Sequence, residues 1–494
     1  VGYLTLDRQS RTLSGGEVMR INLTTALGTS LVNTLFVLDE PSVGLHSRDI
    51  GRLISVLRRL RDAGNTLLVV EHDPELIAAA DTVIDMGPGP GERGGKVVFQ
   101  GSVSALLKSH TSLTAKYLRG ERTVHSGSPS EGFSGKAGPA LTVLGARENN
   151  LKNIDVRFPL GGLVVVSGVS GSGKSTLIDD VLYRALLRQK GKPTESPGLH
   201  QRIVGAEQVE DIVFIDQSPI GKTTRSNPVS YVGAFDRIRK LFADSPLAKE
   251  RGYSALTFSF NSGTGRCPTC GGSGFEHVEM QFLSDVYIRC PDCGGRRFRS
   301  DVCEVKIGAE RELSIAEVLD LTVNEACEFF SSDSIHDTAV VESLLPLRAV
   351  GLGYLSLGQP VPTLSSGEAQ RLKIAGYLTG SGTKGHTLFL LDEPTTGLHF
   401  DDIAVLLSAL RALIAEGHSL IVIEHNLDVI AQADWVIDLG PEGGDAGGRL
   451  LFSGTPRELM REEGNHTGRA LSRYLTVRGR VPEYAAEKAE PYRA

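Results

Sequence analysis

The feature that most constrains this chain is an internal duplication. The segment "LFVLDEPSVGLH" at 35–46 returns as "LFLLDEPTTGLH" at 388–399, and "LLVVEHDPELIAAADTVIDMGPG" at 67–89 returns as "LIVIEHNLDVIAQADWVIDLGPE" at 420–442. Both pairs are separated by 353 positions (35 to 388, 67 to 420). One offset shared by two separate segments indicates a duplicated structural unit. The chain should therefore contain two copies of one fold.

Each copy has the pattern of a parallel α/β sheet. An apolar run ends in Asp-Glu, a helical stretch follows, and a second apolar run ends in Glu-His. The runs are of strand length and rich in Val, Ile and Leu, which is typical of buried parallel strands that alternate with helices. We therefore predict an α/β fold in which the Asp-Glu strand of each copy is buried.

The rest of the chain falls into segments around these copies. We expect the first copy over 1–120, a Ser-, Gly- and Pro-rich linker over 121–140, the second copy over 141–477 and a polar tail over 478–494. The second copy carries an insertion at about 185–345 that includes all six cysteines. The sequence opens at Val1 inside domain-like sequence, so we interpret it as a fragment.

Composition excludes some classes of protein. The net charge is -7, so a nucleic-acid partner would need a local basic patch. Six cysteines are too few for a disulfide scaffold, which favours a reducing, cytosolic compartment. The apolar runs are shorter than the roughly 18 residues of a spanning helix, and no signal peptide opens the chain. We expect no membrane association.

A phosphate-binding loop follows the strand-like run "LVVVS". The stretch "GVSGSGKS" at 168–175 fits GxxxxGK[ST]. Backbone N–H groups of such a loop close around phosphates, the lysine reaches the β and γ phosphates, and the last hydroxyl binds Mg²⁺. The alternative is a purely structural Gly-rich turn. The predicted ATP-binding residues are Gly168, Ser170, Gly171, Gly173, Lys174, Ser175 and Thr176.

Paired acids end a strand in each copy, where buried carboxylates are costly unless a cation or a reacting water uses them. We predict that Asp392 binds Mg²⁺ and that Glu393 orients or deprotonates the attacking water. Repeat symmetry gives Asp39 and Glu40 the same roles. The alternative is an acid pair that caps the following helix.

Two histidines recur at one spacing from these acids. His72 and His425 each lie 33 positions after the aspartate of their copy (39 to 72, 392 to 425) and could contact a γ-phosphate. Gln217, after another strand-like run, could link Mg²⁺ to the insertion. A structural role remains the alternative for each of them.

Four of the cysteines have the spacing of a metal site. Cys267, Cys270, Cys290 and Cys293 form Cys-x2-Cys-x19-Cys-x2-Cys, which fits a structural tetrathiolate zinc site. Disulfides or an iron–sulfur cluster are the alternatives. We interpret Cys303, in a strand-like run, and Cys327, in a helix-like run, as ordinary buried thiols.

Basic residues gather near these cysteines. Arginines surround the second cysteine pair, and a polar loop before it carries a lysine and an arginine that could contact phosphates and sugars. A solvated basic surface is the alternative. No base-reading element is evident, so DNA would be bound through its backbone and shape. The candidate DNA-binding residues are Lys222, Arg225, Arg289, Arg296, Arg297 and Arg299.

These motifs together resemble a known family. Signature sequences "LSGGE" at 13–17 and "LSSGE" at 364–368, with the duplicated acids and histidines, resemble ATP-binding cassette (ABC-type) ATPases. The segments "IDQSPIGKTTRSNPVSYVG", "FSFNSGTGRCPTCGGSGF" and "TLFLLDEPTTGLHFDDI" narrow the resemblance to the UvrA family of bacterial nucleotide excision repair. The resemblance runs from about Gly2 to Leu475.

The resemblance implies two cassettes arranged head to tail, the first incomplete, with a zinc module inserted in the second. It implies that Ser14, Gly15 and Gly16 close over ATP held by Lys174, Ser175, Gln217, Asp392, Glu393 and His425. The opposite site would use Asp39, Glu40 and His72 with the second signature, Ser365, Ser366 and Gly367. Its P-loop is expected in an amino-terminal portion outside this sequence.

The resemblance also implies a function and partners. A UvrA-like chain would be a damage-sensing ATPase, not itself a nuclease, that binds damaged double-stranded DNA as a homodimer and uses ATP, Mg²⁺ and Zn²⁺. It would work with a repair helicase subunit whose binding domain is not in this sequence. "SGGEVMR" departs from the usual "SGGEAQR", so the alternative is a paralogue acting in drug tolerance or as a DNA-binding scaffold with weak ATPase. A transporter ATPase would have no reason to carry the four cysteines.

Overall fold

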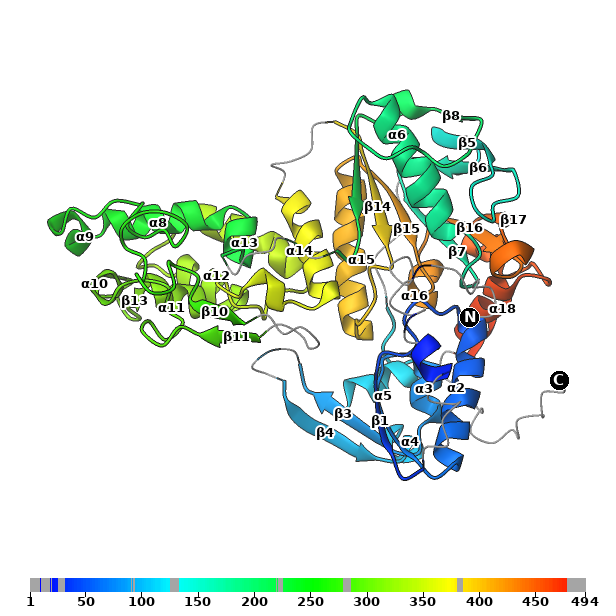
Figure 1. Ribbon diagram of the computed structural model, residues 1–494, viewed down its shortest axis with the longest axis horizontal. Coiled ribbons are helices and arrows are strands. Elements are labelled where there is room, and N and C mark those ends of the chain that lie inside the picture. Colours follow the sequence, from blue (N-terminus) through cyan, green and yellow to red (C-terminus); the bar gives the residue numbers. More distant parts are fainter. Residues whose placement is uncertain are drawn as a thin grey trace. The chain divides into compact units, whose positions relative to one another are not determined.

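The computed structural model (Figure 1) describes residues 9, 18, 20–24, 32–89, 91, 94–124, 133–218, 220, 225–278, 286–379 and 385–477. The chain forms two compact units. The first, which we call the sheet unit, comprises Val1–Asp216 and Thr383–Ala494, and the second, the cysteine unit, comprises Gln217–Gly382. The expected insertion at about 185–345 overlaps the cysteine unit, and the expected domain boundaries stay a prediction.

A six-stranded sheet is the centre of the second repeat, and its strand order is β17-β16-β7-β15-β14-β9. Neighbouring strands are parallel except for β17, which runs antiparallel to β16. The sheet confirms the predicted α/β class. Its strands are β7 (Leu163–Gly168), β9 (Asp211–Ile215), β14 (Thr387–Asp392), β15 (Ser419–Ile423), β16 (Trp435–Gly440) and β17 (Arg449–Gly454).

Both faces of this sheet are covered, which explains the continuous apolar runs of its strands. One face packs on the π-helical segment η3 (Thr176–Tyr183) and on a three-stranded sheet, β6-β5-β8, through residues such as Val166, Ile178 and Phe158. Helix α15 (Phe400–Ala415) contacts β15. The other covering elements are β5 (Ala140–Ala146), β6 (Ile154–Pro159), α6 (Arg184–Gln189), β8 (Arg202–Val204) and η4 (Ala206–Gln208).

The first repeat contains the same elements up to its helix α5, each 353 positions earlier, but not the same sheet. Its strands form two separate pairs, parallel β1-β2 and antiparallel β3-β4. The elements are β1 (Leu35–Asp39), α2 (Ser47–Asp62), β2 (Thr66–Val70), α3 (Pro74–Ala79), β3 (Val83–Gly87), β4 (Lys96–Gly101), α4 (Val103–Leu106) and α5 (Leu113–Leu118). In the second repeat β7 lies between β15 and β16; among the described residues the first repeat supplies no counterpart of β7.

The prediction of a buried first-repeat strand is therefore wrong for this structure. Leu35 and Val37 of β1 are 60% and 63% exposed, whereas every residue of β14 up to Leu391 is buried. A two-stranded sheet covered on one face buries only alternate side chains. The covered face packs on α2, whose Ile50, Leu53 and Leu57 recur at helical spacing.

Helices near the ends of the two repeats complete the sheet unit. Helix α16 (Leu427–Ala431) follows β15, and α17 (Pro456–Leu459) and α18 (His466–Val477) follow β17, with the short turn η6 (Gly444–Ala446) before it. Helix α18 contacts α2 of the first repeat and α16 of the second. The two repeats thus pack together within the sheet unit.

The cysteine unit consists mostly of helices with two small hairpins. Helix α13 packs on α12 and α8. The elements are α7 (Pro228–Tyr231), α8 (Ala234–Asp244), α9 (Pro246–Glu250), β10 (Phe275–Val278), β11 (Val286–Arg289), α10 (Ser300–Cys303), β12 (Lys306–Ile307), β13 (Leu313–Ser314), α11 (Ile315–Asp320), α12 (Val323–Ser331), α13 (Thr338–Ala349), η5 (Val361–Thr363) and α14 (Ser366–Leu378). Within the described part of the chain, every helix is too short or too polar to span a bilayer.

Candidate nucleotide site and cysteine cluster

Two positions of the P-loop require glycine. Gly168 ends β7 with φ +137°, and a Cβ placed there would lie 2.1 Å from the carbonyl oxygen of Leu439. At Gly173 (φ +101°) a Cβ would lie 2.9 Å from Oδ1 of Asn150. Such backbone is strained for any other residue. Glycine is thus required at both positions, and the role of the loop as a phosphate cradle stays a prediction.

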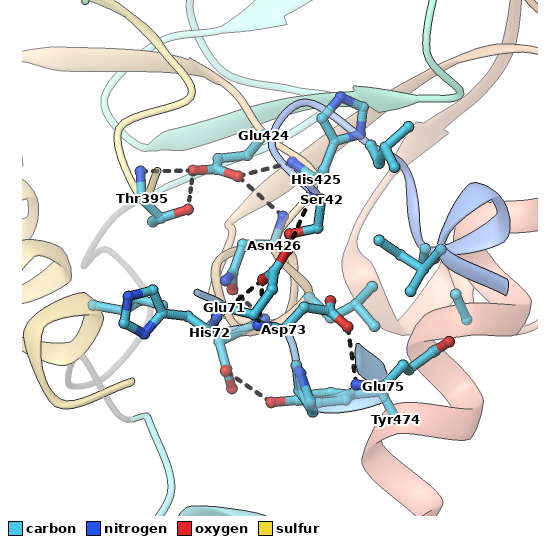
Figure 2. Close-up of a pocket in the computed structure, with 18 of the residues that line it drawn as sticks. Ser42, Glu71, His72, Asp73, Glu75, Thr395, Glu424, His425, Asn426 and Tyr474 are labelled. Carbon is cyan, nitrogen blue, oxygen red and sulfur yellow. Dashed lines mark hydrogen bonds between the residues drawn. The ribbon is translucent and has the colours of Figure 1, made fainter. Parts of the chain in front are cut away.

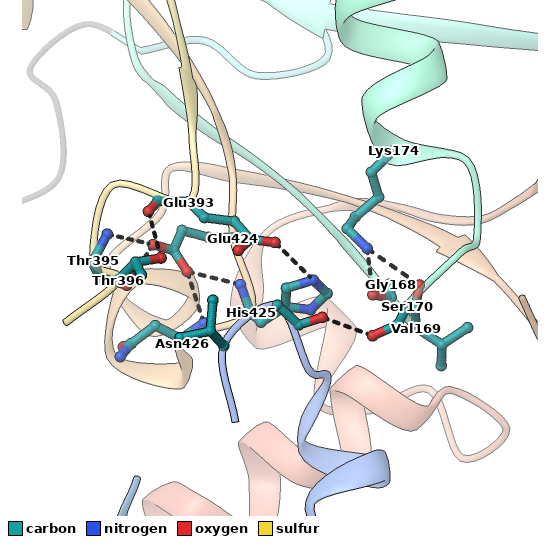
Figure 3. A network of polar contacts seen from close by, with 12 residues as sticks. Gly168, Val169, Ser170, Lys174, Glu393, Thr395, Thr396, Glu424, His425 and Asn426 are labelled. Carbon is teal, nitrogen blue, oxygen red and sulfur yellow. Dashed lines mark hydrogen bonds and ion pairs between the residues drawn. The ribbon is translucent and has the colours of Figure 1, made fainter. Parts of the chain in front are cut away.

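Lys174 is held inside this cradle. Its Nζ donates to the carbonyl oxygens of Gly168 (3.0 Å) and Val169 (3.2 Å), as Figure 3 shows. Burial lowers the pKa of Lys174, and the nearby Glu393 and Asp392 carboxylates oppose that shift. The loop therefore keeps a buried cation where an anionic ligand would bind.

The two acids of the second repeat are half-buried and lie within electrostatic range of Lys174. Burial, with Asp392 and Glu424 adding to it, raises the pKa of Glu393 to about 8. Burial also raises the pKa of Asp392 to about 6, against the influence of Lys174. Neither acid caps the following helix, because the cap of α15 is His399. The helix-capping alternative is thus wrong for Asp392 and Glu393.

His425 lies next to these acids. Its Nε2 is 3.7 Å from Oε1 of Glu393, its side chain is 9% exposed, and burial holds its pKa well below the usual value. Its Nδ1 is buried without a hydrogen-bond partner in the described structure. An orphaned ring nitrogen close to the P-loop suits an absent polar ligand.

A glutamate that the sequence analysis did not single out orders this loop. Both carboxylate oxygens of Glu424 are used: Oε1 accepts from the backbone N–H of Thr395 (3.0 Å), and Oε2 accepts from those of His425 (2.8 Å) and Asn426 (3.0 Å) (Figure 3). The signal was present, because "EH" follows the apolar run in both copies.

The first repeat reproduces this arrangement. Glu71 accepts from the backbone N–H groups of Ser42 (2.8 Å), His72 (2.9 Å) and Asp73 (3.1 Å), as Figure 2 shows. Nε2 of His72 is 4.0 Å from Oε1 of Glu40. The His72 side chain is 39% exposed, against 9% for His425. The second-repeat site is the drier of the two.

The loop after each acid pair reaches the acid of the other repeat. Oγ of Ser170 donates to the carbonyl oxygen of Gly44 at 2.8 Å. A Cβ on Gly44 would lie 3.5 Å from the Glu393 carboxylate, and one on Gly397 would lie 3.0 Å from that of Glu40. A cavity of about 660 Å³ between these loops is lined by both glutamates and both histidines. The spacing of residues in the sequence could not predict that these two loops, 353 positions apart, lie in contact.

The remaining predicted nucleotide residues belong to other elements or lie outside the described residues. Ser14, Gly15 and Gly16 lie outside the described residues, as does Lys222. Ser365 caps α14 through a capping box with Glu368, and Ser366 and Gly367 form its first turn. Gln217 follows β9 by two residues and opens the cysteine unit. Asp39 ends β1, and Ser175 precedes η3, which Thr176 opens.

The four cysteines meet in one cluster. Their Sγ atoms all lie within 4.8 Å of one another, and those of Cys270 and Cys293 are 3.8 Å apart. Thiolates at about 2.3 Å from a tetrahedral zinc ion would lie about 3.8 Å apart. All four are free thiols, so the disulfide alternative is wrong for this structure. Cys303 ends a short helix instead of lying in a strand, and Cys327 is buried in α12.

The candidate DNA-binding arginines differ in exposure. Arg289 and Arg296 are exposed; Arg299 is exposed but paired with Asp301 at 2.6 Å. Arg225 is half-buried and donates to the carbonyl oxygen of Gly271 (3.0 Å).

Arg297 does not suit the DNA-binding role predicted for it. Its residue is 3% exposed, its Nη2 donates to the carbonyl oxygen of Gly358 (2.7 Å), and its guanidinium lies 5.2 Å from the centre of the Phe260 ring. Burial lowers its pKa to about 10. The side chain stabilises the interior of the cysteine unit, so it cannot reach a DNA phosphate.

The duplicated helix caps give a testable stability difference. Asp73 caps α3 by accepting from Glu75 N (2.9 Å) and Leu76 N (3.0 Å), and burial raises its pKa to about 7. Asn426 occupies the equivalent position before α16 and forms the same type of cap. Because the folded pKa exceeds the unfolded value near 4, the stability that Asp73 contributes is present below pH ~4 and is lost as the pH rises through 7.

Asp73→Asn should therefore raise the free energy of unfolding by on the order of 1–2 kcal/mol at pH 8, and by much less at pH 4. Urea unfolding at both pH values measures the effect. Asn426→Asp is the matched control and should destabilise most at pH 8. An equal effect of Asp73→Asn at both pH values would contradict the argument.

Comparisons with known proteins show which proteins this chain is similar to. No family model matches the chain. UvrABC system protein A of Thermus thermophilus is 52% identical over 479 residues, covering 97% of this chain and 49% of that protein. The protein of the same name from Methanothermobacter thermautotrophicus is 52% identical over 473 residues, covering 96% of this chain and 48% of that protein.

A solved structure agrees as well. The crystal structure of UvrA2 from Deinococcus radiodurans aligns with a TM-score of 0.86 and 46% identity, covering 96% of this chain and 56% of that one. The chain spans about half the length of the curated relatives it matches. By sequence over nearly its whole length and by structure, the chain matches the UvrA family.

Proposed function

We propose that this chain is the ATP-binding and ATP-hydrolysing part of a damage-sensing protein of nucleotide excision repair. One observation carries the proposal: Lys174 in its glycine cradle is within electrostatic range of the half-buried Asp392 and Glu393 and of His425, while Gly44 of the first repeat contacts the same loop through Ser170. A P-loop with an acid pair and a contribution from a second repeat suits hydrolysis of a nucleoside triphosphate.

Each side chain has a role in this proposal. The P-loop N–H groups and Lys174 would bind the phosphates, and Glu393 would orient the attacking water while His425 contacts the γ-phosphate. Ser175 and Asp392 would hold Mg²⁺, which neutralises phosphate charge when bound. Ser14, Gly15 and Gly16 would close the site, and Gln217 would link it to the cysteine unit. Asp39, Glu40, His72 and the Ser365–Gly367 signature would serve a second site.

DNA binding is the less direct part of the proposal. Arg289, Arg296 and Arg299 near the cysteine cluster, with Arg225 and Lys222, offer phosphate contacts without a base-reading element. Such contacts suit recognition of a distorted backbone. We further propose that the protein acts as a homodimer in the cytoplasm and cooperates with a helicase subunit of the excision system.

The discriminating experiment compares duplexes with and without a lesion. Purified protein should bind a lesion-bearing duplex more tightly than the undamaged duplex, and ATP should change that preference across a salt series. Arg296→Ala should weaken binding to both duplexes and reduce the salt slope by about one. Equal binding to both duplexes with and without ATP would instead favour a paralogue that acts as a scaffold or in drug tolerance.

The cysteine cluster is proposed to hold one structural Zn²⁺. Cys290→Ser should remove the bound metal and lower the melting temperature of the cysteine unit, because a three-thiolate site with a hydroxyl binds zinc far less tightly. Metal analysis of reduced, folded protein checks the stoichiometry. Cys303→Ser is the matched control, since Cys303 lies outside the cluster and should leave the zinc content unchanged. Folded wild-type protein without zinc would contradict the assignment.

A further inference from the structure

A buried chain of hydrogen bonds joins the two repeats at the nucleotide site. Nε2 of His46, in the loop after the first acid pair, lies 3.0 Å from Oγ1 of Thr467 in α18 of the second repeat. That hydroxyl donates to Oδ1 of Asp438 in β16 at 2.6 Å. His46, Thr467 and Asp438 are 1%, 1% and 2% exposed. None of these three residues is among the predicted nucleotide-site residues.

An equivalent chain of hydrogen bonds runs from the second repeat to the first. Nε2 of His399, in the second repeat, lies 3.3 Å from Oγ1 of Thr114 in α5 of the first, and that hydroxyl donates to Oδ1 of Asp85 at 2.9 Å. Each of these residues is 353 positions from its counterpart (46 to 399, 114 to 467, 85 to 438). A contact preserved in both directions after the duplicated sequences have diverged is unlike an incidental surface contact.

The donors define the direction of the hydrogen bonds. The backbone N–H of Arg48 donates to Nδ1 of His46 (3.2 Å), and that of Asp401 donates to Nδ1 of His399 (3.3 Å). A neutral imidazole whose Nδ1 accepts must carry its proton on Nε2. Each histidine therefore donates to a threonine of the other repeat, and the threonine donates to an aspartate.

The buried chain continues to the groups proposed for hydrolysis. Oγ of Ser167, the residue before the P-loop, lies 3.4 Å from Oγ1 of Thr467. The rings of His46 and His425 meet edge to face with centroids 6.0 Å apart, and His72 and His399 do the same at 6.4 Å. His46 is thus linked to Ser167 through Thr467, and its ring contacts that of His425, the histidine that faces Glu393.

We propose that the His46–Thr467–Asp438 relay is a positioning device that couples the loop of the first repeat to the P-loop and His425 of the second. The inference rests on the proposed ATPase function. Hydrolysis of ATP bound at the P-loop of the second repeat then depends on the first repeat through this relay as well as through Gly44. Binding of the nucleotide depends on it much less, because none of the three residues belongs to the P-loop at 168–175.

The test removes one hydroxyl. Thr467→Val keeps the side-chain shape but leaves the His46 N–H and the Asp438 oxygen without their shared partner. We expect kcat for ATP to fall about 10- to 100-fold while nucleotide affinity changes less than about 3-fold. Thr467→Ser restores the hydroxyl and should return kcat to within about 3-fold of wild type. Thr114→Val, the equivalent change in the other relay, should lower kcat much less.

Two outcomes would overturn the proposal. One is an unchanged kcat in Thr467→Val, and the other is a serine variant as slow as the valine variant, which would show that only packing matters. A wild-type chain that binds no ATP would instead overturn the proposed function.

The His46–Thr467–Asp438 relay can also be tested in protein without bound nucleotide. In histidine-labelled protein, NMR should show His46 as the neutral Nε2–H tautomer with a slowly exchanging proton, and Thr467→Val should make that proton exchange at least about 10-fold faster. A His46 proton that exchanges equally fast in both proteins would overturn the relay itself.

Discussion

Lys174→Ala should nearly abolish ATP binding by this chain. The lysine is the buried cation of the glycine cradle, and its ammonium group is held there by the Gly168 and Val169 carbonyl oxygens, ready to exchange them for phosphate oxygens. A charge-assisted contact in a dry site is worth several kcal/mol. We therefore expect the Kd for ATP to rise at least about 100-fold. Titration with a fluorescent ATP analogue measures the change.

Two control variants separate the effect of losing a positive charge from the effect of the position of Lys174. Lys152→Ala removes one lysine from an exposed site of the same repeat and should leave affinity unchanged. Lys174→Arg retains the charge but places a larger, planar group where the buried lysine ammonium contacts the Gly168 and Val169 carbonyl oxygens, so it should also bind poorly. Unaltered ATP affinity in Lys174→Ala would show that the cradle is not the nucleotide site.

The sequence predicted the local arrangement of the P-loop and the clustering of the four cysteines, while the chemical roles of these residues stay predictions. The glycines, Lys174 and Ser175 lie within one turn of chain, and a strand before them and a helical segment after them fix their arrangement. The same holds for the cysteines, whose two Cys-x2-Cys turns meet as the spacing predicted. Contacts between side chains that are close in sequence depend little on the rest of the fold.

Burial and contacts between repeats could not be predicted in this way. Leu35 and Leu388 lie in matching sequences, yet the first is 60% exposed and the second fully buried, because only the second lies in a six-stranded sheet. Arg297 lies among exposed arginines in the sequence, but a backbone with φ +69° turns it inward. His46 meets Thr467 only because α18 packs on α2. These outcomes depend on neighbours that no local pattern specifies.

Glu393→Gln should uncouple ATP binding from hydrolysis. Glutamine has the same shape and can still hydrogen-bond, so the cradle stays intact, but it lacks the carboxylate that orients or deprotonates the attacking water. We expect turnover to fall at least about 100-fold with ATP affinity retained. Because burial and the Asp392 and Glu424 carboxylates disfavour a charge at this position, the variant should also unfold at a temperature no lower than wild type. Phosphate release and calorimetry measure the two effects.

Repeat symmetry supplies the matched variant for this experiment. Glu40→Gln makes the same chemical change in the first repeat, where Glu40 faces Gly397 and His72. Among the described residues no P-loop accompanies Glu40, so its loss should change turnover at the Lys174 site by less than about 3-fold. If both variants lose activity equally, turnover depends on the two acids together, and the assignment of water activation to Glu393 alone is wrong. If neither variant loses activity, Asp392 or a substrate phosphate must take the proton from the attacking water. The role of Glu393 would then be confined to positioning His425, whose Nε2 is 3.7 Å from Oε1 of Glu393.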